Sequence, residues 1–487
     1  MQPPSFAQFQ KLAERGNVIP LAEDLLADLT TPVAAFLKLC GEHENGFLLE
    51  SVEGGERFAR YSFLGRRPRE IIHADREKVY VTASSTARTF EMDFFLYLQR
   101  HLQKHRLVPQ PELPRFCGGL VGYFGYDAVR LLEKLPARNA STAPLARFGF
   151  YDTVLAFDHL RQRILIIANA LVDEHASLRA QYEDALQRLA ETKAALQQPL
   201  PMLPPRSSAR GVLRANFSEA DFCRAVLQAQ EHIRAGDIFQ VVLSQKFSQP
   251  VSASPFDIYR ALRVINPSPY LYFLRHDGQT LIGSSPELMV RVENNEAIVR
   301  PIAGTRPRGG SLDEDQRLAA ELRADEKERA EHVMLMDLGR NDIGRVAHYG
   351  GVRITENMSL ERYSHVMHLV SEIRGKLRPG MDAIAAFKAC FPAGTVTGAP
   401  KVRAMEIIAE LEPEPRAWYA GAMGYLDFSG NLDTCIAIRT LEVQNGIASF
   451  QAGAGIVADS IPAKEYAETI HKSNAMRAAI AMAENGL

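Results

Sequence analysis

The feature that most constrains the fold is a succession of short β-type segments in the middle of the chain. Between residues 238 and 301 these segments are rich in Val, Ile, Leu, Tyr and Phe. The connections between neighbouring segments are short, which favours antiparallel pairing because parallel neighbours need a long crossover. The expected strands are 238–247, 270–275, 280–283, 288–292 and 297–301.

The rest of the chain alternates between strand blocks and helix blocks. Helices are expected to dominate from residue 301 to about residue 411, and a closing helix is expected to begin near Ala463. Strand blocks separated by helix blocks predict an α+β fold with a large, mainly antiparallel, sandwich-like sheet system and helices packed outside. Further strands are expected at 46–51, 163–168, 421–427, 434–443 and 447–453.

A proline- and serine-rich segment divides the sequence. In QQPLPMLPPRSSARG (197–211) the prolines exclude a helix and the serines favour a loop. An amphipathic helix pattern precedes it at 174–197, and Ser218 begins a capping box that predicts a helix to about Arg234. We therefore expect a strand-rich N-terminal region (1–196), a linker (197–214) and a C-terminal region (215–487).

Composition excludes several functional classes. The chain of 487 residues is 46% hydrophobic and carries a net charge of −2, so bulk charge does not draw it to nucleic acid or membrane. Five scattered cysteines without a CxxC pair predict neither a disulfide framework nor structural zinc, and favour the cytoplasm. The N-terminus lacks the apolar core of a signal peptide, and no apolar run approaches the roughly 20 residues of a membrane span.

One arginine-rich segment suggests an anionic ligand. VRPIAGTRPRG (299–309) contains Arg300, Arg306 and Arg308 with two glycines, directly after a strand-like run. Arginine can hold a carboxylate with two parallel hydrogen bonds.

Two ExxE elements could hold a metal ion. Glu328 and Glu331 are three residues apart on an expected helix, and Glu465 and Glu468 are spaced likewise. Residues at this spacing share one helix face, and two such faces could present oxygen ligands to Mg²⁺. A solvated acidic face, paired with neighbouring cations such as Lys472, is the alternative.

A histidine pair lies in RYSHVMHLVS. His365 and His368 are three residues apart, but a third ligand for zinc is missing nearby. We expect His368 on an apolar helix, VMHLV, as a satisfied core residue or as a base or hydrogen-bond donor in a pocket.

Two glycine-rich turns bear hydroxyl groups. FPAGTVTGAPK (391–401) and QAGAGIV (451–457) match neither the Walker pattern nor GxGxxG. Bare backbone amides with Thr395, Lys401 and Arg439 nearby suit carboxylate binding, and ordinary tight turns are the alternative.

The order of these motifs resembles that of the chorismate-utilising enzymes. The resemblance covers residues 215–480 and includes SPE (285–287), PIAGTRPRG, ExxEH, DLGRND, GTVTGAPK, DTCIAIRT, QAGAG and ExxExxxK. Residues 48–65 and 118–127 resemble the N-terminal region of anthranilate synthase component I and its relatives. The fold implied is that of the chorismate-utilising enzymes.

The resemblance also implies residue roles. Glu287 would be the general acid, and His368 and Thr395 would line the ring pocket together with Gln240. Mg²⁺ would lie on Glu331 and Glu468, with Glu328 and Glu465 nearby. The residues implied in substrate binding are Thr305, Tyr419, Arg439, Gly453, Gly455 and Lys472.

Two departures from the relatives' patterns indicate the nucleophile. Many aminodeoxychorismate synthases have a nucleophilic lysine at the position of Ala303, and the water-adding isochorismate and salicylate synthases have a lysine base at the position of Gln240. Neither lysine is present, so ammonia is expected to add directly at ring C2. Loss of pyruvate then gives anthranilate, the first committed step of tryptophan biosynthesis. We expect a separate glutamine amidotransferase subunit to supply ammonia, in a heterotetramer of two large and two small subunits.

The N-terminal resemblance implies feedback control by L-tryptophan. The inhibitor would bind between an LLES strand and an NPSPY segment, and the alternative is a strand and a rigid turn that pack the core. The residues implied are Glu50, Ser51, Pro269, Tyr270, Leu271, Met423 and Tyr425.

Other functions remain open at this point. An aminodeoxychorismate synthase that uses ammonia directly would keep the ring amine without pyruvate loss. A non-catalytic tryptophan-binding protein conflicts with the intact glutamates, His368 and Arg439. A helical dimetal protein conflicts with the missing Glu-x-x-His elements and the many strands.

Overall fold

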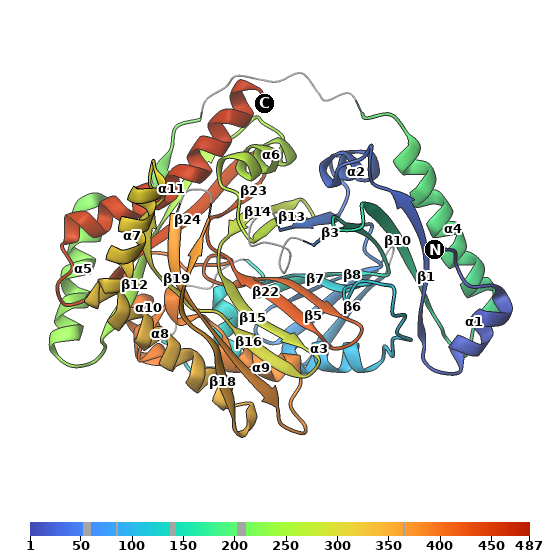
Figure 1. Ribbon diagram of the computed structural model, residues 1–487, viewed down its shortest axis with the longest axis horizontal. Helices are drawn as coiled ribbons and strands as arrows, with labels where there is room; N and C mark the ends of the chain where they lie inside the picture. Colours follow the sequence, from blue (N-terminus) through green and yellow to red (C-terminus); the bar gives the residue numbers. More distant parts are fainter. Residues whose placement is uncertain (52–59, 84–85, 137–142, 202–210, 364–365) are drawn as a thin grey trace.

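Two antiparallel sheets packed face to face form the centre of the molecule. The computed structural model describes residues 1–51, 60–83, 86–136, 143–201, 211–363 and 366–487 (Figure 1). In this part of the chain each sheet has twelve strands. A single cluster of buried side chains from both sheets fills the space between them. The predicted α+β, sandwich-like architecture with outer helices is confirmed.

The first sheet joins strands from both ends of the sequence. Its N-terminal half meets its C-terminal half where β2 pairs antiparallel with β13. The order is β1 (Val18–Leu26), β10 (Arg163–Leu171), β9 (Thr153–Asp158), β3 (Tyr61–Arg66), β2 (Gly46–Glu50), β13 (Tyr270–His276), β14 (Gln279–Ser285), β23 (Thr440–Gln444), β24 (Ile447–Ile456), β12 (Gln240–Pro250) and β11 (Arg214–Ala215), with β20 (Gly398–Ala399) also on β12.

The second sheet is assembled in the same way, through the pairing of β21 with β7. Both sheets are thus continuous across the two sequence regions. The order is β17 (Ile302–Pro307), β19 (Val366–Leu377), β16 (Glu296–Val299), β15 (Leu288–Glu293), β22 (Leu432–Ile436), β21 (Ala422–Asp427), β7 (Gly119–Phe124), β8 (Ala146–Tyr151), β4 (Glu70–Ala74), β5 (Lys78–Ala83) and β6 (Thr86–Glu91), with β18 (Ala347–Arg362) on the other edge of β19.

Alternation along the strands of the first sheet buries both of its faces. Val18 and Phe47 point into the inter-sheet core, whereas their neighbours Ile19 and Leu48 belong to the outer core. This is the two-residue period of a strand. Helices α2, α4, α6 and α11 contribute to the outer core, so the near-continuous apolar runs of these strands have partners on both sides.

The helices lie outside the two sheets (Figure 1). Ser218 accepts a hydrogen bond from the Asp221 N–H, so the predicted cap at the start of α5 is confirmed. No helix in the described segments is long and apolar enough to span a membrane. The helices are α1 (Phe6–Ala13), α2 (Pro32–Leu39), α3 (Phe94–Gln103), α4 (Leu178–Gln197), α5 (Glu219–Arg234), α6 (Pro255–Ile265), α7 (Leu312–Ala324), α8 (Glu326–Gly344), α9 (Ala383–Cys390), α10 (Lys401–Leu411) and α11 (Pro462–Asn485), with 3₁₀ turns at Tyr126–Leu131 and Gly394–Val396.

Three expectations about local structure are wrong. The segment around His368 is not a helix but strand β19, and β18 is a second long strand within the stretch expected to be helical. Residues 366–371 are almost all buried, and a short apolar run of this kind does not distinguish a buried strand from a buried helix. The expected strand 434–443 is two strands, β22 and β23. His365 and most of the expected linker (202–210) lie outside the described residues.

Candidate active site

Glu287 is a buried carboxyl group in the connection between β14 and β15. Its carbonyl accepts a hydrogen bond from the Ile436 N–H at 3.0 Å, and the residue is 8% exposed. Burial raises the pKa of Glu287 from 4.5 to about 8, although Thr395, Arg439 and Lys472 each oppose the rise. The group is therefore protonated at neutral pH and can donate a proton.

Arg439 brings a guanidinium group next to this acid. It lies between β22 and β23 in the left-handed region, at φ 48°, and its carbonyl accepts from the Ser284 N–H. Burial lowers the pKa of Arg439, and the nearby Glu287 opposes this. Among the described residues, its side chain makes no hydrogen bond or ion pair to the protein. A partly buried cation of this kind is suited to an anionic ligand.

The glycines of β24 leave backbone exposed beside Lys472. The Lys472 Nζ donates to the Gly453 carbonyl at 3.0 Å and pairs with Glu468 at 2.7 Å. A Cβ on Gly453 would lie 3.0 Å from the Tyr419 hydroxyl, and one on Gly455 would lie 2.7 Å from the Gln240 Nε2. A Cβ on Gly453 would also lie 2.8 Å from the Leu243 carbonyl, so glycine is favoured there, whereas the flexible Gln240 side chain can shift to accommodate a Cβ at Gly455.

His368 is held by the segment that contains Gly304 and Thr305. Its Nδ1 lies 3.0 Å from the Gly304 carbonyl and 3.1 Å from the Thr305 hydroxyl. Because a carbonyl can only accept, Nδ1 carries the proton, and Nε2 of the neutral ring is an acceptor. Burial lowers the pKa of His368, and the nearby Arg439 adds to this effect. His368 is thus a neutral base candidate close to Arg439.

The two ExxE elements lie on helices α8 and α11, as predicted. Burial raises the pKa of Glu331, with Glu328 adding to the rise and the Gln240 amide opposing it. Burial likewise raises the pKa of Glu465, and Glu468 adds to it.

The lysines of these helices show that the two carboxylate pairs are near each other. The charge of Lys327 on α8 opposes the rise in the pKa of Glu465, and the charge of Lys472 on α11 opposes the rise in the pKa of Glu331. Carboxylate oxygens such as these are the ligands that a hard dication prefers. Within the described residues, however, no three His, Cys, Asp or Glu side chains converge closely enough to hold a metal ion.

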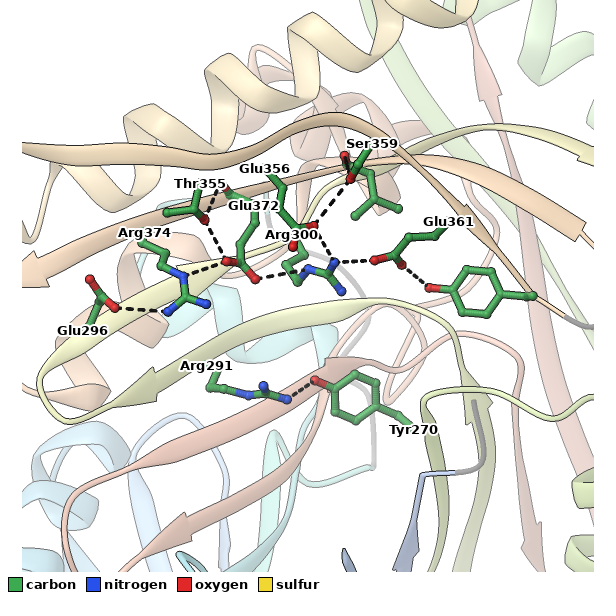
Figure 2. A network of polar contacts seen from close by, with 12 residues as sticks. Tyr270, Arg291, Glu296, Arg300, Thr355, Glu356, Ser359, Glu361, Glu372 and Arg374 are labelled. Carbon is green, nitrogen blue, oxygen red and sulfur yellow. Dashed lines mark hydrogen bonds and ion pairs between the residues drawn. The ribbon is translucent and has the colours of Figure 1, made fainter. Parts of the chain in front are cut away.

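The arginines of VRPIAGTRPRG are paired within the protein, contrary to what their composition suggested. Arg300 pairs with Glu356, Glu361 and Glu372, as Figure 2 shows. Arg306 pairs with three acidic side chains, including Glu328 at 3.3 Å, and Arg308 pairs with Asp315. An anionic ligand must therefore be met by other cations, of which Arg439 is the best placed.

A separate cavity of about 100 Å³ lies between β2, β13 and β21. All seven residues implied in tryptophan binding line it, from Glu50 and Ser51 to Tyr425. By volume it could hold on the order of seven water molecules. Phe63 forms part of the wall and meets Tyr425 edge to face at 6.3 Å, so the cavity has the aromatic surface that an indole ring prefers.

Two features of this cavity were not foreseen. The Glu50 carboxylate accepts from Tyr259 and pairs with Arg263 at 3.0 Å, so its charge is already compensated. Asp433 also lines the cavity, where it accepts from Tyr270 at 3.1 Å and pairs with Arg291. No sequence signal marked Asp433, since it lies in an ordinary strand position of β22.

A buried acid, a guanidinium that has no side-chain partner among the described residues and a histidine with its Nδ1 proton bound form a site in this α+β fold that is suited to a small anionic ligand. The family model for chorismate binding enzymes matches residues 46–478, so the chain belongs to the chorismate binding enzyme family.

Individual relatives agree with this assignment over nearly the full length. The chain is 46% identical to anthranilate synthase component 1 of Acetivibrio thermocellus, over 98% of each chain, and 46% identical to that of Pseudomonas aeruginosa, over 99% of each. The crystal structure of anthranilate synthase component I from Streptococcus pneumoniae superposes with a TM-score of 0.78 at 40% identity, covering 93% of this chain and 99% of that one. The isochorismate synthase MenF from Escherichia coli shares the fold, with a TM-score of 0.72 at 18% identity, covering 98% of this chain and 100% of that one.

Proposed function

We propose that this chain is the chorismate-converting subunit of anthranilate synthase, which turns chorismate and ammonia into anthranilate, pyruvate and water. The observation that carries the proposal is the near full-length similarity to proteins named anthranilate synthase component 1. The side chains at two positions support ammonia as the nucleophile. Ala303 has no group that can attack the ring, and the Gln240 amide cannot deprotonate water.

Substrate recognition rests on cations and bare amides. The enolpyruvyl carboxylate would bind Arg439, whose guanidinium has no partner among the described side chains, with Lys472 and the amides around Gly453 and Gly455 completing the site. Tyr419 supports this proposal because its hydroxyl lies against Gly453. Burial raises the pKa of Tyr419 to about 12, so it is a donor rather than an anion.

Two proton transfers follow from the protonation states. Protonated Glu287 would donate to the C4 hydroxyl, which leaves as water while ammonia adds at C2. Aromatisation then requires loss of the C2 proton and cleavage of the C3–O bond, and the departing enolpyruvyl group takes up a proton to become pyruvate. Neutral His368, fixed by Gly304 and Thr305, has a free Nε2 lone pair for that proton. Thr395, whose hydroxyl is buried beside Glu287, would orient the acid.

Magnesium is the cofactor that the donor set favours. Glu331 and Glu468 would hold it, with Glu328 and Glu465 nearby, because these carboxylates present oxygen ligands. The pKa values of Glu331 and Glu465 are raised, and Glu468 pairs with Lys472. When bound, Mg²⁺ would neutralise the ring carboxylate and stabilise charge as bonds rearrange.

Partners and control complete the proposal. Ammonia would come from a separate glutamine amidotransferase subunit, in a cytoplasmic heterotetramer of two large and two small subunits. L-tryptophan would inhibit by binding in the 100 Å³ cavity lined by Ser51 and Tyr270. Because inhibitor and substrate would favour different conformations, chorismate should weaken tryptophan binding by the same factor by which tryptophan weakens chorismate binding.

The test is to incubate the purified chain with chorismate, Mg²⁺ and ammonium, and to measure anthranilate fluorescence and pyruvate release together. We expect equal amounts of both products, and no product when glutamine replaces ammonium. An aminated product that still carries the enolpyruvyl group, formed without release of pyruvate, would indicate aminodeoxychorismate synthase and refute the proposal. Glutamine-dependent activity of the chain alone would refute the partner subunit.

A further inference from the structure

The imidazole of His368 has a restraint beyond its hydrogen bond to the main chain. The bond to the Gly304 carbonyl fixes one ring nitrogen, but a ring held at one point can still tilt about it. Tyr363 packs edge to face against the imidazole, with ring centroids 5.7 Å apart and an interplanar angle of 61°. Contacts of this geometry are favourable beyond the area that they bury.

Tyr363 is itself fixed at several points. Its N–H donates to the Val366 carbonyl at 2.8 Å, and its carbonyl accepts from Arg308 at 2.7 Å. Its hydroxyl donates to one oxygen of Glu361 at 2.6 Å. Glu361 lies directly opposite His368 on the neighbouring strand, so tyrosine, glutamate and histidine form one local group at the end of the β18–β19 pair.

Arg300 holds the other oxygen of Glu361, at 2.6 Å (Figure 2). The guanidinium is 9% exposed and also binds Glu356 at 3.1 Å and Glu372 at 3.4 Å. Charge-assisted hydrogen bonds are short and strong when they are shielded from water. Arg300 thus fixes the carboxylate that binds Tyr363, and it lies four residues before Gly304, whose carbonyl binds His368.

We propose that Tyr363, held by Glu361 and Arg300, is a positioning residue that sets the tilt of the His368 ring in the site. This proposal rests on the role given to His368 above. A small cavity of about 20 Å³ is lined by Tyr363 and Arg300 and not by His368. Without the hydroxyl bond to Glu361, the tyrosine ring is expected to shift towards this cavity.

The kinetic test compares three variants with ammonium as nitrogen source. Tyr363→Leu removes the ring and should lower kcat by about 10- to 100-fold, because a misplacement of about 1 Å costs up to about 10²-fold. The KM for chorismate should change by less than about threefold. Tyr363→Phe keeps the ring but loses its bond to Glu361, so its kcat should lie between those of Tyr363→Leu and wild type. The matched control is Tyr349→Leu, a fully exposed tyrosine of β18, which should change neither.

A second measurement does not depend on turnover. In ¹³C-labelled protein, the His368 imidazole signal is assigned by its absence in His368→Asn and titrated by NMR. Tyr363→Leu should raise the pKa of His368 towards its ordinary value, since water then reaches the ring beside Arg439 and Glu361, whereas Tyr363→Phe should leave it unchanged. An unchanged pKa in Tyr363→Leu would overturn the proposal, and so would a kcat no lower than that of Tyr349→Leu. A chain that makes no anthranilate but shows this pKa change would refute the proposed function alone.

The Leu variant could fail to fold, and a double-mutant cycle covers that case. Tyr363→Phe and Glu361→Ala each remove the hydrogen bond between the Tyr363 hydroxyl and Glu361, so the double variant should lose little more kcat than the more affected single variant. Additive effects, or no effect of either change, would contradict the positioning role.

Discussion

Replacing Glu287 with glutamine should inactivate the enzyme and stabilise the fold at the same time. The amide has nearly the same shape as the protonated acid but cannot donate the required proton. Loss of a general acid costs about 10²- to 10⁴-fold in kcat. If Glu287 only supported the structure, its replacement would instead lower the stability of the protein.

The expected stability gain follows from the burial of this carboxyl. Each unit of pKa corresponds to about 1.4 kcal/mol, so raising the pKa of Glu287 from 4.5 to about 8 corresponds to about 5 kcal/mol. Between these two values the folded chain binds more protons than the unfolded chain. The free energy of unfolding therefore falls as pH rises from 4.5 to 8.

The glutamine variant lacks this dependence on pH. Relative to wild type, its gain should be near zero at pH 4, about 3 kcal/mol at pH 7 and about 5 kcal/mol at pH 9, since the gain accumulates only between the two pKa values, 4.5 and about 8. The full gain needs the carboxyl to remain in its buried environment, so local opening would reduce it.

Guanidinium unfolding at these three pH values measures the gain. The chain has a single tryptophan, Trp418, which is 4% exposed, and its fluorescence reports unfolding. Glu231→Gln is the control, because the Glu231 side chain is 71% exposed and should give no gain that depends on pH. A Glu287→Gln variant that is less stable than wild type at pH 9, or that retains more than a tenth of kcat, would refute the reasoning.

Four further outcomes are expected. Glu331→Gln should nearly abolish turnover and alter the Mg²⁺ dependence with a thermal midpoint no lower than that of wild type; normal Mg²⁺ titration would contradict the metal site. Glu412→Gln should cost about 3–5 kcal/mol in urea unfolding, because Arg416 and Glu412 form a pair with 1% of each side chain exposed; a loss below 1 kcal/mol would contradict this. Ser51→Phe should keep activity and abolish tryptophan binding in calorimetry, so wild-type affinity would rule out the cavity. Intact mass after incubation with chorismate should show no adduct on the segment around Ala303, and a stable adduct there would exclude direct attack by ammonia.

Patterns with a regular period could be predicted from the sequence. The strands between residues 238 and 301 and the helix capped by Ser218 appear within a few residues of their expected bounds. The exceptions are physical. Strand β19 is covered on both faces, so its apolar run lacks the alternation of a half-exposed strand. The expected strand 434–443 is interrupted where Arg439 takes up a left-handed conformation, and no glycine marks that position.

The candidate site shows why composition alone is a weak guide to a ligand. Arg300, Arg306 and Arg308 lie within nine residues of the sequence, yet acidic side chains of the same chain pair with all three. Arg439 stands alone in the sequence and has no such partner in the described structure. Whether an arginine binds a ligand or a carboxylate of its own chain depends on which strands the fold places beside it.

The pairing of β17, β19 and β18 illustrates that dependence. It brings Thr305, His368 and Glu361 into one row, from three strands that span residues 302–377. A one-residue slip of β19 would turn His368 to the other face of the sheet. Arg300 therefore has a structural role. It pairs with carboxylates of both β18 and β19, and so helps to keep the strand register that places His368 in the site.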